Sequence, residues 1–428
     1  MKSSTRYLLI AFGFFIFIIL APLLILYVSG TRLNFSSRNT DSTGILDAKT
    51  NPSNATLFID GKEHSKTPAI ARFLDQGEYV FTLTKDGYYD WSKRLPIESD
   101  KVTYAQSGVE VIQLIKKSQP TLIVPNGVKS FALTNNEVWF TENNSVGYAP
   151  INDFSNQKFI PLKFTPQNIQ SLRDKGHLFI SNKDAYAVID TQTHSVFPID
   201  FNLNPDDAVV IGNVLIFQAG TELQNYNLIT KKSVTITNDI SGFTMLGNTA
   251  YFADNSGNIS IGVWDGQRLK DIQPIVSGQA IAKGQNQLII TNQKRLFLLD
   301  SSKNLYRVNQ TLELVASQVE AVNLDLKTDE LVIRTSSELG FYNFLQDKLQ
   351  LLTRSTNPAL SFLIRSNIGY GFVGTSTGLE AIEIDSRDQQ NRYQLLHNEP
   401  IWQLAITDDQ KTIIALQGDS LISMEIRN

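Results

Sequence analysis

The chain has 428 residues, of which 42% are hydrophobic and 19% charged, so it can bury a sizeable core and exceeds the length of one ordinary domain. Its 38 Lys and Arg residues are outnumbered by 42 Asp and Glu residues, and the net charge of -4 argues against a nucleic-acid-binding protein with a basic face. There is no cysteine, which excludes disulfide frameworks, thiolate metal sites and thiol nucleophiles, and four histidines leave few candidates for histidine-based catalysis.

An uncharged apolar stretch lies near the start of the chain. Residues 7–28 read YLLIAFGFFIFIILAPLLILYV, and in a helix they would extend about 33 Å, enough to cross a hydrocarbon core of roughly 30 Å. The stretch is longer than the apolar region of a cleaved signal peptide and ends without a good cleavage site. We therefore expect a transmembrane signal anchor over residues 1–30, with the lipid bilayer as its partner. Lys2 and Arg6 favour a cytoplasmic N-terminus, which would place the later domains outside the cytoplasm.

A polar tether and a small β domain follow. Residues 31–43 are rich in Ser, Asn and Thr and predict a flexible linker. Over residues 44–117 the apolar residues alternate with period two and are separated by turn signals such as Asp60-Gly61 and Asp86-Gly87. This pattern predicts a small β-sandwich, near the lower size limit for independent stability.

The small domain carries an ordered set of short motifs. They are Asn51-Pro52-x-x-Ala55, Leu57-x-Ile59-Asp60-Gly61, Thr67-Pro68, Gly77-x-Tyr79 and Lys85-x-Gly87-Tyr88. The set resembles the PEGA domain family, although the Pro-Glu-Gly-Ala core of that family here reads Pro52-Ser53-Asn54-Ala55. Asn is the best substitute for Gly at a left-handed turn position, so the turn can survive this change. The resemblance implies a prokaryotic surface or envelope protein whose small domain binds or packs against other envelope components.

From Ser118 onward the chain repeats a pattern. A short apolar strand that ends in Asp or Asn, followed by a polar turn, recurs at intervals of 37, 38, 35, 43 and 42 residues. With more divergent first and last copies this makes about eight repeats of a period near forty, which is typical of β-propeller blades. Helical repeats are disfavoured because the alternation has period two. The spacing fits the WD40 range, but the Gly-His and Trp-Asp signatures do not recur. The six clear copies end at Asp190, Asn227, Asp265, Asp300, Asn343 and Asp385.

The end of the chain predicts how the ring closes. The last copy stops directly after its third strand, while Thr121–Val124 is a strand outside the repeats. We expect Thr121–Val124 to pair with Ser420–Ile426 and to complete the last blade, which removes two exposed sheet edges. The propeller would then occupy residues 118–428 and have seven or eight blades.

Several chemical motifs do not support a site. Gly374-Thr375-Ser376-Thr377-Gly378 matches G-x-S-x-G, but a strand rather than a helix follows it, so we interpret it as a hairpin tip. The block Gly418-Asp419-Ser420-Leu421 is followed by no histidine. Residues 254–258 lack the acidic residue that would complete a calcium loop. Quinone-dependent dehydrogenases, which also use eight blades, have repeated Trp motifs and often adjacent cysteines that this chain lacks. The four histidines, which show no metal-ligand spacing, are His64, His177, His194 and His397.

These observations define the expected fold and function. The expected fold class is all-β, with an N-terminal transmembrane helix, a small PEGA-like β-sandwich and a seven- or eight-bladed β-propeller. We expect no catalytic, cofactor-binding or metal-binding residues, and no cofactor. The predicted function is that of a non-enzymatic, membrane-anchored extracytoplasmic binding or scaffold protein of a prokaryotic envelope. Its ligand, presented to the propeller face, would be an envelope protein or a polysaccharide.

Two alternative functions stay open. One is an envelope assembly factor that binds client proteins by strand addition to an exposed blade edge. The other is a hydrolase of envelope glycans, which would need paired carboxylates that converge in the central channel.

Overall fold

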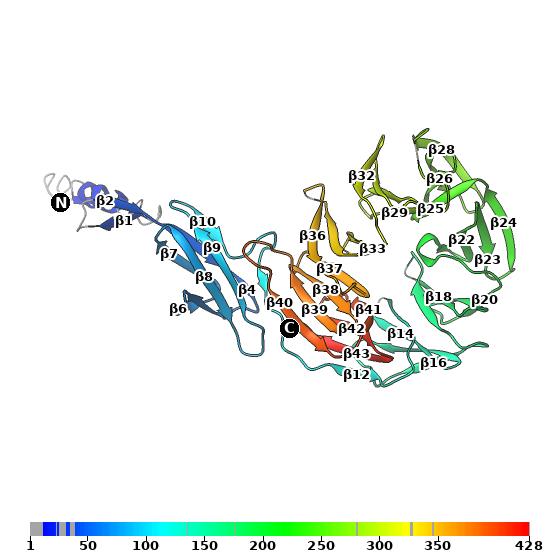
Figure 1. The fold of residues 1–428 in the computed structure, drawn as a ribbon, viewed down its shortest axis with the longest axis horizontal. Helices are drawn as coiled ribbons and strands as arrows, with labels where there is room; N and C mark the ends of the chain where they lie inside the picture. Colours follow the sequence, from blue (N-terminus) through cyan, green and yellow to red (C-terminus); the bar gives the residue numbers. More distant parts are fainter. Residues whose placement is uncertain are drawn as a thin grey trace, which may run out of the picture.

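The computed structural model of the chain describes residues 12–22, 24, 31–34, 39–134, 136–174, 176–279, 281–325, 328–344 and 346–427. Within this part, β-strands predominate, beside a helix at residues 12–22 and a short 3-10 helix, η1 (Pro205–Asp207). Two β domains follow one another along the chain (Figure 1). The first is a small sandwich over residues 43–117, called the sandwich domain below, and the second is a ring of sheets over residues 121–426.

The structure corrects the prediction of a transmembrane helix over residues 7–28. Among the residues it describes, no helix is long and apolar enough to cross a membrane. The helix at residues 12–22 extends about 16 Å, roughly half the thickness of a hydrocarbon core. Residues 7–11, 23 and 25–28 of the expected span lie outside the described part of the chain. The fold class is therefore corrected to all-β, and the transmembrane helix is withdrawn from it.

The sandwich domain consists of two small sheets that enclose a common core. Leu57, Phe81, Leu83 and Trp91 alternate with outward-facing residues on their strands and are completely buried between the sheets. One sheet has the order β10 (Val102–Tyr104), β3 (Gly44–Ala48), β7 (Ala69–Leu74), and the other has the order β6 (Lys62–Lys66), β5 (Thr56–Ile59), β8 (Gly77–Thr84), β9 (Trp91–Ile97). A short parallel pair joins β4 (Thr50–Asn51) to β11 (Ile112–Gln113), and within the expected tether β1 (Thr31–Asn34) pairs with β2 (Asn39–Ser42).

The described residues of the second domain form eight four-stranded antiparallel sheets, which are the blades of a β-propeller (Figure 1). In blades 1 to 7 the strands follow chain order from the axis to the rim, and blade 8 has the order β41, β42, β43, β12. Blade 1 consists of β13 (Phe131–Thr134), β14 (Glu137–Glu142), β15 (Ser145–Pro150) and β16 (Lys158–Pro161). Blade 2 consists of β17 (Asn168–Ser171), β18 (His177–Ser181), β19 (Tyr186–Asp190) and β20 (Val196–Ile199). Blade 3 consists of β21 (Val209–Ile211), β22 (Val214–Ala219), β23 (Glu222–Asn227) and β24 (Lys232–Thr237). Blade 4 consists of β25 (Ile240–Leu246), β26 (Thr249–Asp254), β27 (Ile259–Trp264) and β28 (Leu269–Val276). Blade 5 consists of β29 (Gln287–Ile290), β30 (Leu296–Leu299), β31 (Leu305–Val308) and β32 (Leu312–Ala316). Blade 6 consists of β33 (Ala321–Asp325), β34 (Glu330–Arg334), β35 (Glu338–Asn343) and β36 (Lys348–Arg354). Blade 7 consists of β37 (Ser361–Arg365), β38 (Tyr370–Thr375), β39 (Gly378–Glu383) and β40 (Arg392–His397). Blade 8 consists of β41 (Ile401–Ile406), β42 (Thr412–Gln417), β43 (Ser420–Glu425) and β12 (Thr121–Val124).

The repeated Asp and Asn residues turn the chain between the strands of a blade. The Asp190 carboxylate accepts hydrogen bonds from the backbone N–H groups of Gln192 and Thr193, at 2.8 and 3.0 Å, directly after the third strand of blade 2. Such side-chain-to-backbone bonds fix a tight turn, so the repeat signal is one of turn chemistry. Asp300 is the exception, because it follows the second strand of blade 5 and not the third.

Blade 8 joins the two ends of the propeller segment. Strand β12 lies antiparallel to β43, with Thr121 opposite Ser423 and Leu122 opposite Ile422. Ile123 and Val124 are buried against blade 1. The sequence predicts this partner for the Thr121–Val124 strand, and the pairing leaves β12 as the rim strand of a complete four-stranded sheet.

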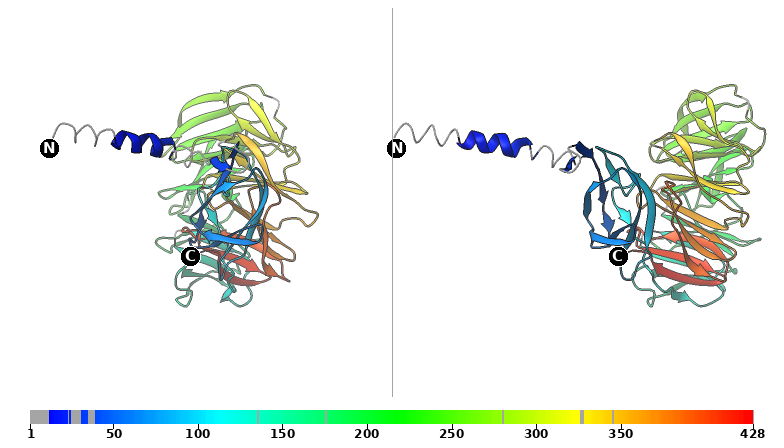
Figure 2. Two further views of the ribbon diagram at one scale, coloured as in Figure 1. Left: turned by 90° about the vertical axis from the view of Figure 1, so that its left-hand side faces the viewer. Right: turned by 60° about the vertical axis from the view of Figure 1, so that its left-hand side comes forward.

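The sandwich domain packs directly against blade 7 (Figure 1, Figure 2). The Trp91 indole N–H donates a hydrogen bond to the Glu383 carboxylate at 2.8 Å, and the Lys93 ammonium lies 3.1 Å from the same carboxylate. The Tyr89 ring stacks on Tyr393 with 4.9 Å between centroids. Such buried and hydrogen-bonded contacts fix one domain on the other.

Candidate functional site: the central channel of the propeller

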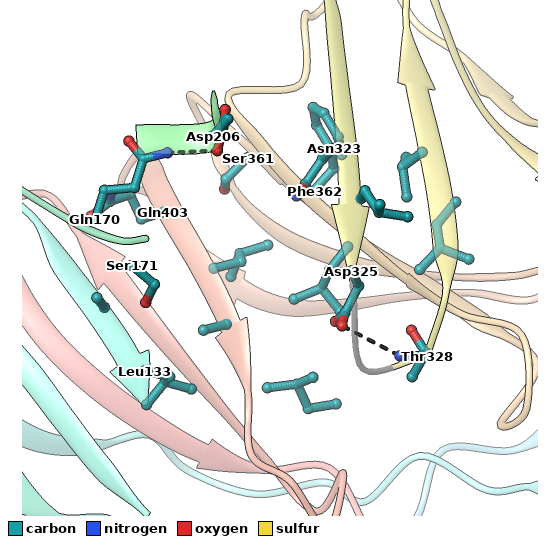
Figure 3. Close-up of a pocket in the computed structure, with 18 of the residues that line it drawn as sticks. Leu133, Gln170, Ser171, Asp206, Asn323, Asp325, Thr328, Ser361, Phe362 and Gln403 are labelled. Atoms are coloured by element: carbon teal, nitrogen blue, oxygen red, sulfur yellow. Dashed lines mark hydrogen bonds between the residues drawn. The ribbon is translucent and has the colours of Figure 1, made fainter. Parts of the chain in front are cut away.

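A cavity of about 790 Å³ lies in the central channel (Figure 3). Its walls are the first strands of blades 1, 2, 5, 6, 7 and 8, because the first strand of each sheet lies nearest the axis of the ring. Asp206 of η1, in the connection between blades 2 and 3, also lines it. The side chains that project from these strands determine what the cavity can bind.

One end of the cavity carries aromatic side chains. The pairing of β41 with β42 shifts between Ile401 and Gln403, which is a β-bulge, and Trp402 at the bulge lines the cavity with 50% of its surface exposed. The Ser361 hydroxyl donates a hydrogen bond to the Ile401 carbonyl at 2.8 Å. Because this bond aligns β37 with β41, the residues that follow, Phe362 and Trp402, lie at the same level of the channel. We call this end the Trp402 end.

Amide side chains surround the same end. Figure 3 shows Gln170, Gln403 and Asn323 among the side chains of the wall. The Gln170 amide donates to the Asp206 carboxylate at 2.9 Å, and the Gln403 amide oxygen accepts from the Phe131 backbone N–H at 2.9 Å. Two of the three amides therefore hold the wall together, while Asn323 is exposed to the channel.

An arginine from blade 2 reaches across to two other blades. The Arg173 guanidinium donates to the Met245 carbonyl of blade 4 at 2.5 Å and to the Ile290 carbonyl of blade 5. Burial lowers the pKa of Arg173 to about 10, with the nearby Asp207, Asp206 and Asp329 acting in the opposite direction. Since this side chain is bound to backbone carbonyls, it serves to brace the ring.

Two adjacent carboxylates on η1 lie beside Arg173. Burial raises the pKa of Asp207 to about 7, and the neighbouring Asp206 carboxylate raises it further, while a hydrogen bond from Asn204 works against both. The pKa of Asp206 is also raised, again by burial. One Asp207 oxygen is buried without a partner among the described residues. Asp206 faces the cavity, whereas Asp207 points into the wall.

An ion-pair cluster lies near the opposite end. The Arg365 guanidinium is 2.5 Å from the Asp325 carboxylate and 3.3 Å from the Glu330 carboxylate. Two carboxylates therefore do converge here, as a glycan hydrolase would require. They share one buried guanidinium, however, and Glu330 also accepts a hydrogen bond from the Ser366 backbone N–H of blade 7, so the cluster connects blades.

The motifs singled out in the sequence lie outside this cavity. Residues 374–378 form the hairpin between β38 and β39, with Thr375 opposite Gly378, which confirms the interpretation as a hairpin tip. The Asp254 carboxylate accepts hydrogen bonds from the Ser256 and Asn258 backbone N–H groups at 2.8 and 2.9 Å and thus forms a turn. His194 stacks on Tyr148 with 4.5 Å between ring centroids.

The sequence predicts no site residue, and Trp402, Phe362 and Asn323 are identified as lining residues by the structure alone. The one available signal was Trp402, a tryptophan near the start of a strand whose other apolar residues are aliphatic. The direction of the Trp402 side chain depends on the β-bulge in β41, which the sequence does not reveal.

Comparison with known proteins finds one matching family and several solved structures of similar fold. Residues 43–110 match the PEGA domain family, which confirms the resemblance of the small domain. Among solved structures, the computationally designed Ika8 protein has a TM-score of 0.50 at 10% identity, over 72% of this chain and 100% of its own. The C-terminal WD40 domain of Sif2 (TM-score 0.49, 12% identity, 73% and 99% coverage) and Saccharomyces cerevisiae Sqt1 (0.47, 12%, 73% and 99%) are also similar. Among curated protein sequences none matches this chain.

Proposed function

We propose that this chain is a non-enzymatic binding protein of a prokaryotic cell envelope. In this proposal the propeller takes its ligand at the Trp402 end of the channel, and the sandwich domain holds the propeller in a fixed orientation. The PEGA match supports the envelope setting, because that family occurs mainly on prokaryotic surface and envelope proteins. The propeller fold alone is compatible with many functions, so the site has to carry the rest of the argument.

The observation that carries the proposal is the contrast between the two ends of the channel. At the Arg365 end, Arg365, Asp325 and Glu330 form ion pairs that join blades. At the Trp402 end an indole and an amide remain exposed in a cavity of ligand size. Exposed recognition groups without a free acid–base pair beside them favour binding over hydrolysis.

The proposal predicts that the purified full-length chain binds prokaryotic envelope material. The measurement is a pull-down on isolated envelopes, with and without prior protease treatment, against beads without protein. Binding that survives the protease indicates a polysaccharide or lipid ligand, and binding that is lost indicates a protein partner. No capture from untreated envelopes would contradict the proposal.

A second candidate function is the binding of a client protein by strand addition. The rim strands β24, β28 and β32 expose Val234, Ile272 and Leu314 to solvent, and an extended segment could pair with such an edge. Replacing Leu314 with Lys, which protects an edge, should then abolish the protease-sensitive binding. If that binding is unchanged in this variant, the β32 edge is not the site.

A further inference from the structure

We infer that the Trp402 end of the channel binds an uncharged saccharide, as the terminal sugars of a glycan chain. This inference rests on the proposed function and names the class of ligand for the same site. It starts from the exposure of one tryptophan. Trp91, Trp139 and Trp264 are 0%, 0% and 3% exposed, whereas Trp402 is 50% exposed.

The indole of Trp402 offers a surface that suits a sugar ring. Its π face carries partial negative charge, and the C–H groups on one face of a pyranose are apolar with a slight positive charge. Stacking of such a ring on Trp402 would remove apolar surface from water on both partners. Phe362, on the neighbouring inner strand, is partly buried against the core between blades 6 and 7, and the rest of its surface lines the same cavity as a second apolar contact.

Unused hydrogen-bonding groups lie around this surface. Among the described residues, neither the Trp402 indole N–H nor the Asn323 amide has a hydrogen-bond partner. An amide both donates and accepts, as a sugar hydroxyl does, so Asn323 can bind two neighbouring hydroxyls. The Asp206 carboxylate, which already accepts from Gln170, has further lone pairs for a hydroxyl donor.

The charges of the cavity argue against ionic ligands. Arg173 and Arg365 are the two cationic side chains of the described lining, and both are bound to groups of the protein itself. Among the described side chains of the wall, an anionic ligand such as a phosphate would therefore find no available counter-charge. A cationic ligand at this end would need an ionised carboxylate. The Asp206 carboxylate, which faces the cavity, already accepts a hydrogen bond from Gln170, and desolvation raises its pKa.

The size of the cavity also fits. At about 790 Å³ it is in the range of small-molecule sites, about 300–1,000 Å³, and can hold a few sugar rings. The channel walls are strands of six blades, so the site is rigid and suited to the end of a chain.

The test is an array of neutral and N-acetylated oligosaccharides probed with the full-length chain and three variants. The wild-type chain should bind at least one glycan, Trp402→Ala should weaken that binding by about tenfold or more, and Trp402→Phe should keep most of it. The matched control is Tyr104→Ala, which removes an aromatic ring that is 53% exposed on the sandwich domain and should leave binding unchanged. Equal melting temperatures of the variants exclude misfolding as the cause.

Intrinsic fluorescence gives a second readout of the same site. Iodide should quench Trp402 and leave the three buried tryptophans largely unaffected, and the bound glycan should protect this fraction. A wild-type chain that binds no glycan of the array, or a Trp402→Ala variant that binds as well as wild type, overturns the inference. Capture from envelopes that is equal for wild type and Trp402→Ala refutes both the saccharide site and the Trp402 end as the place of binding, but leaves the envelope-binding role of the chain standing. No capture by wild type refutes that role.

Discussion

Lys93 occupies a position on β9 where the alternation of the strand calls for an apolar side chain. Its neighbours on the same face, Trp91 and Leu95, are core residues of the sandwich domain. The Lys93 ammonium donates to the carbonyls of Asp385 and Arg387, both at 2.9 Å, and to that of Gln389 at 3.1 Å, besides its ion pair with Glu383. A buried charge is tolerated only when it is paired and hydrogen-bonded in this way.

Replacing Lys93 with Met should therefore destabilise the chain by about 2–3 kcal/mol, because Glu383 keeps its other donors but loses its counter-charge. Urea unfolding would measure the change, and a cycle with Glu383→Gln would isolate the pair. The control is Lys101→Met, whose ion pair with Glu98 is exposed and contributes little. An unchanged unfolding midpoint for Lys93→Met would show that the junction does not depend on this charge.

Asp207 makes stability depend on pH. Its pKa of about 7 in the folded chain lies above the ordinary value near 3.8, so between these values the folded state binds more protons than the unfolded state. Stability from this group is thus highest below about pH 4 and falls as the pH rises towards 7.

Asp207→Asn, which keeps an oxygen acceptor for Asn204, should remove the loss of stability that Asp207 causes as the pH rises. Its melting temperature relative to wild type should rise from pH 5 to about pH 7 and then level off. The control is Asp184→Asn, at a carboxylate exposed to solvent, where no such trend is expected. Parallel curves for Asp207→Asn and wild type would contradict the assignment.

At the scale of the elements, adjacent blades approach so closely that certain positions accept only glycine. A Cβ atom at Gly374 of β38 would lie 2.3 Å from the Ser361 hydroxyl and 2.8 Å from the Ile401 Cβ. The same Ser361 hydroxyl aligns the first strands of blades 7 and 8. Gly374 therefore keeps the inner strands of blades 7 and 8, which carry Phe362 and Trp402, in register with each other.

Gly374→Ala should cost about 1–3 kcal/mol, because the added methyl group has to displace both neighbours. Thermal unfolding measures this cost, and loss of glycan binding would report the shifted strands. Gly77→Ala is the control, since the nearest atom to its Cβ is 3.8 Å away. Equal stability of the two variants would show that blades 7 and 8 can separate without penalty.

At the scale of the whole molecule, β12 and β43 complete the ring. Ile123 of β12 is 7% exposed and packs between blades 8 and 1, while its neighbour Leu122 is 56% exposed. Ile123→Ser should lower the melting temperature of the propeller, and Leu122→Ser should not.

Replacing residues 118–125 with a Gly-Ser segment of equal length should lower the melting temperature of the propeller sharply. If the melting temperature survives that replacement, the pairing of β12 is not required for a stable ring.

The sequence predicted the β-propeller and the PEGA-like domain because both are encoded by local signals. Turn residues such as Asp190 act on backbone groups two or three positions away, so they recur visibly along the chain. The number of blades stayed open between seven and eight because the first and last copies of the repeat are more divergent than the six clear ones.

The features that the sequence did not predict depend on distant partners. Arg173 binds carbonyls 72 and 117 residues away, and Lys93 binds a carboxylate in blade 7, so neither contact leaves a local pattern. The transmembrane prediction relied on the length of an uncharged apolar stretch, and the described helix at residues 12–22 is shorter than that stretch. The exposure of Trp402 follows from a bulge that only the pairing of β41 with β42 reveals.

The closure of blade 8 has a consequence for the biosynthesis of the chain. Ser420 donates a hydrogen bond to the Pro125 carbonyl across 295 residues of sequence, so the first strand of the propeller has to wait for nearly all of the rest to be synthesised. Until then the growing chain exposes an unpaired edge, and closure of so long a loop is slow. Unpaired edges of this kind lead to aggregation. We therefore expect newly made chains to need protection by a chaperone until β43 emerges, and chains truncated within β43 to aggregate rather than to fold into a seven-bladed ring.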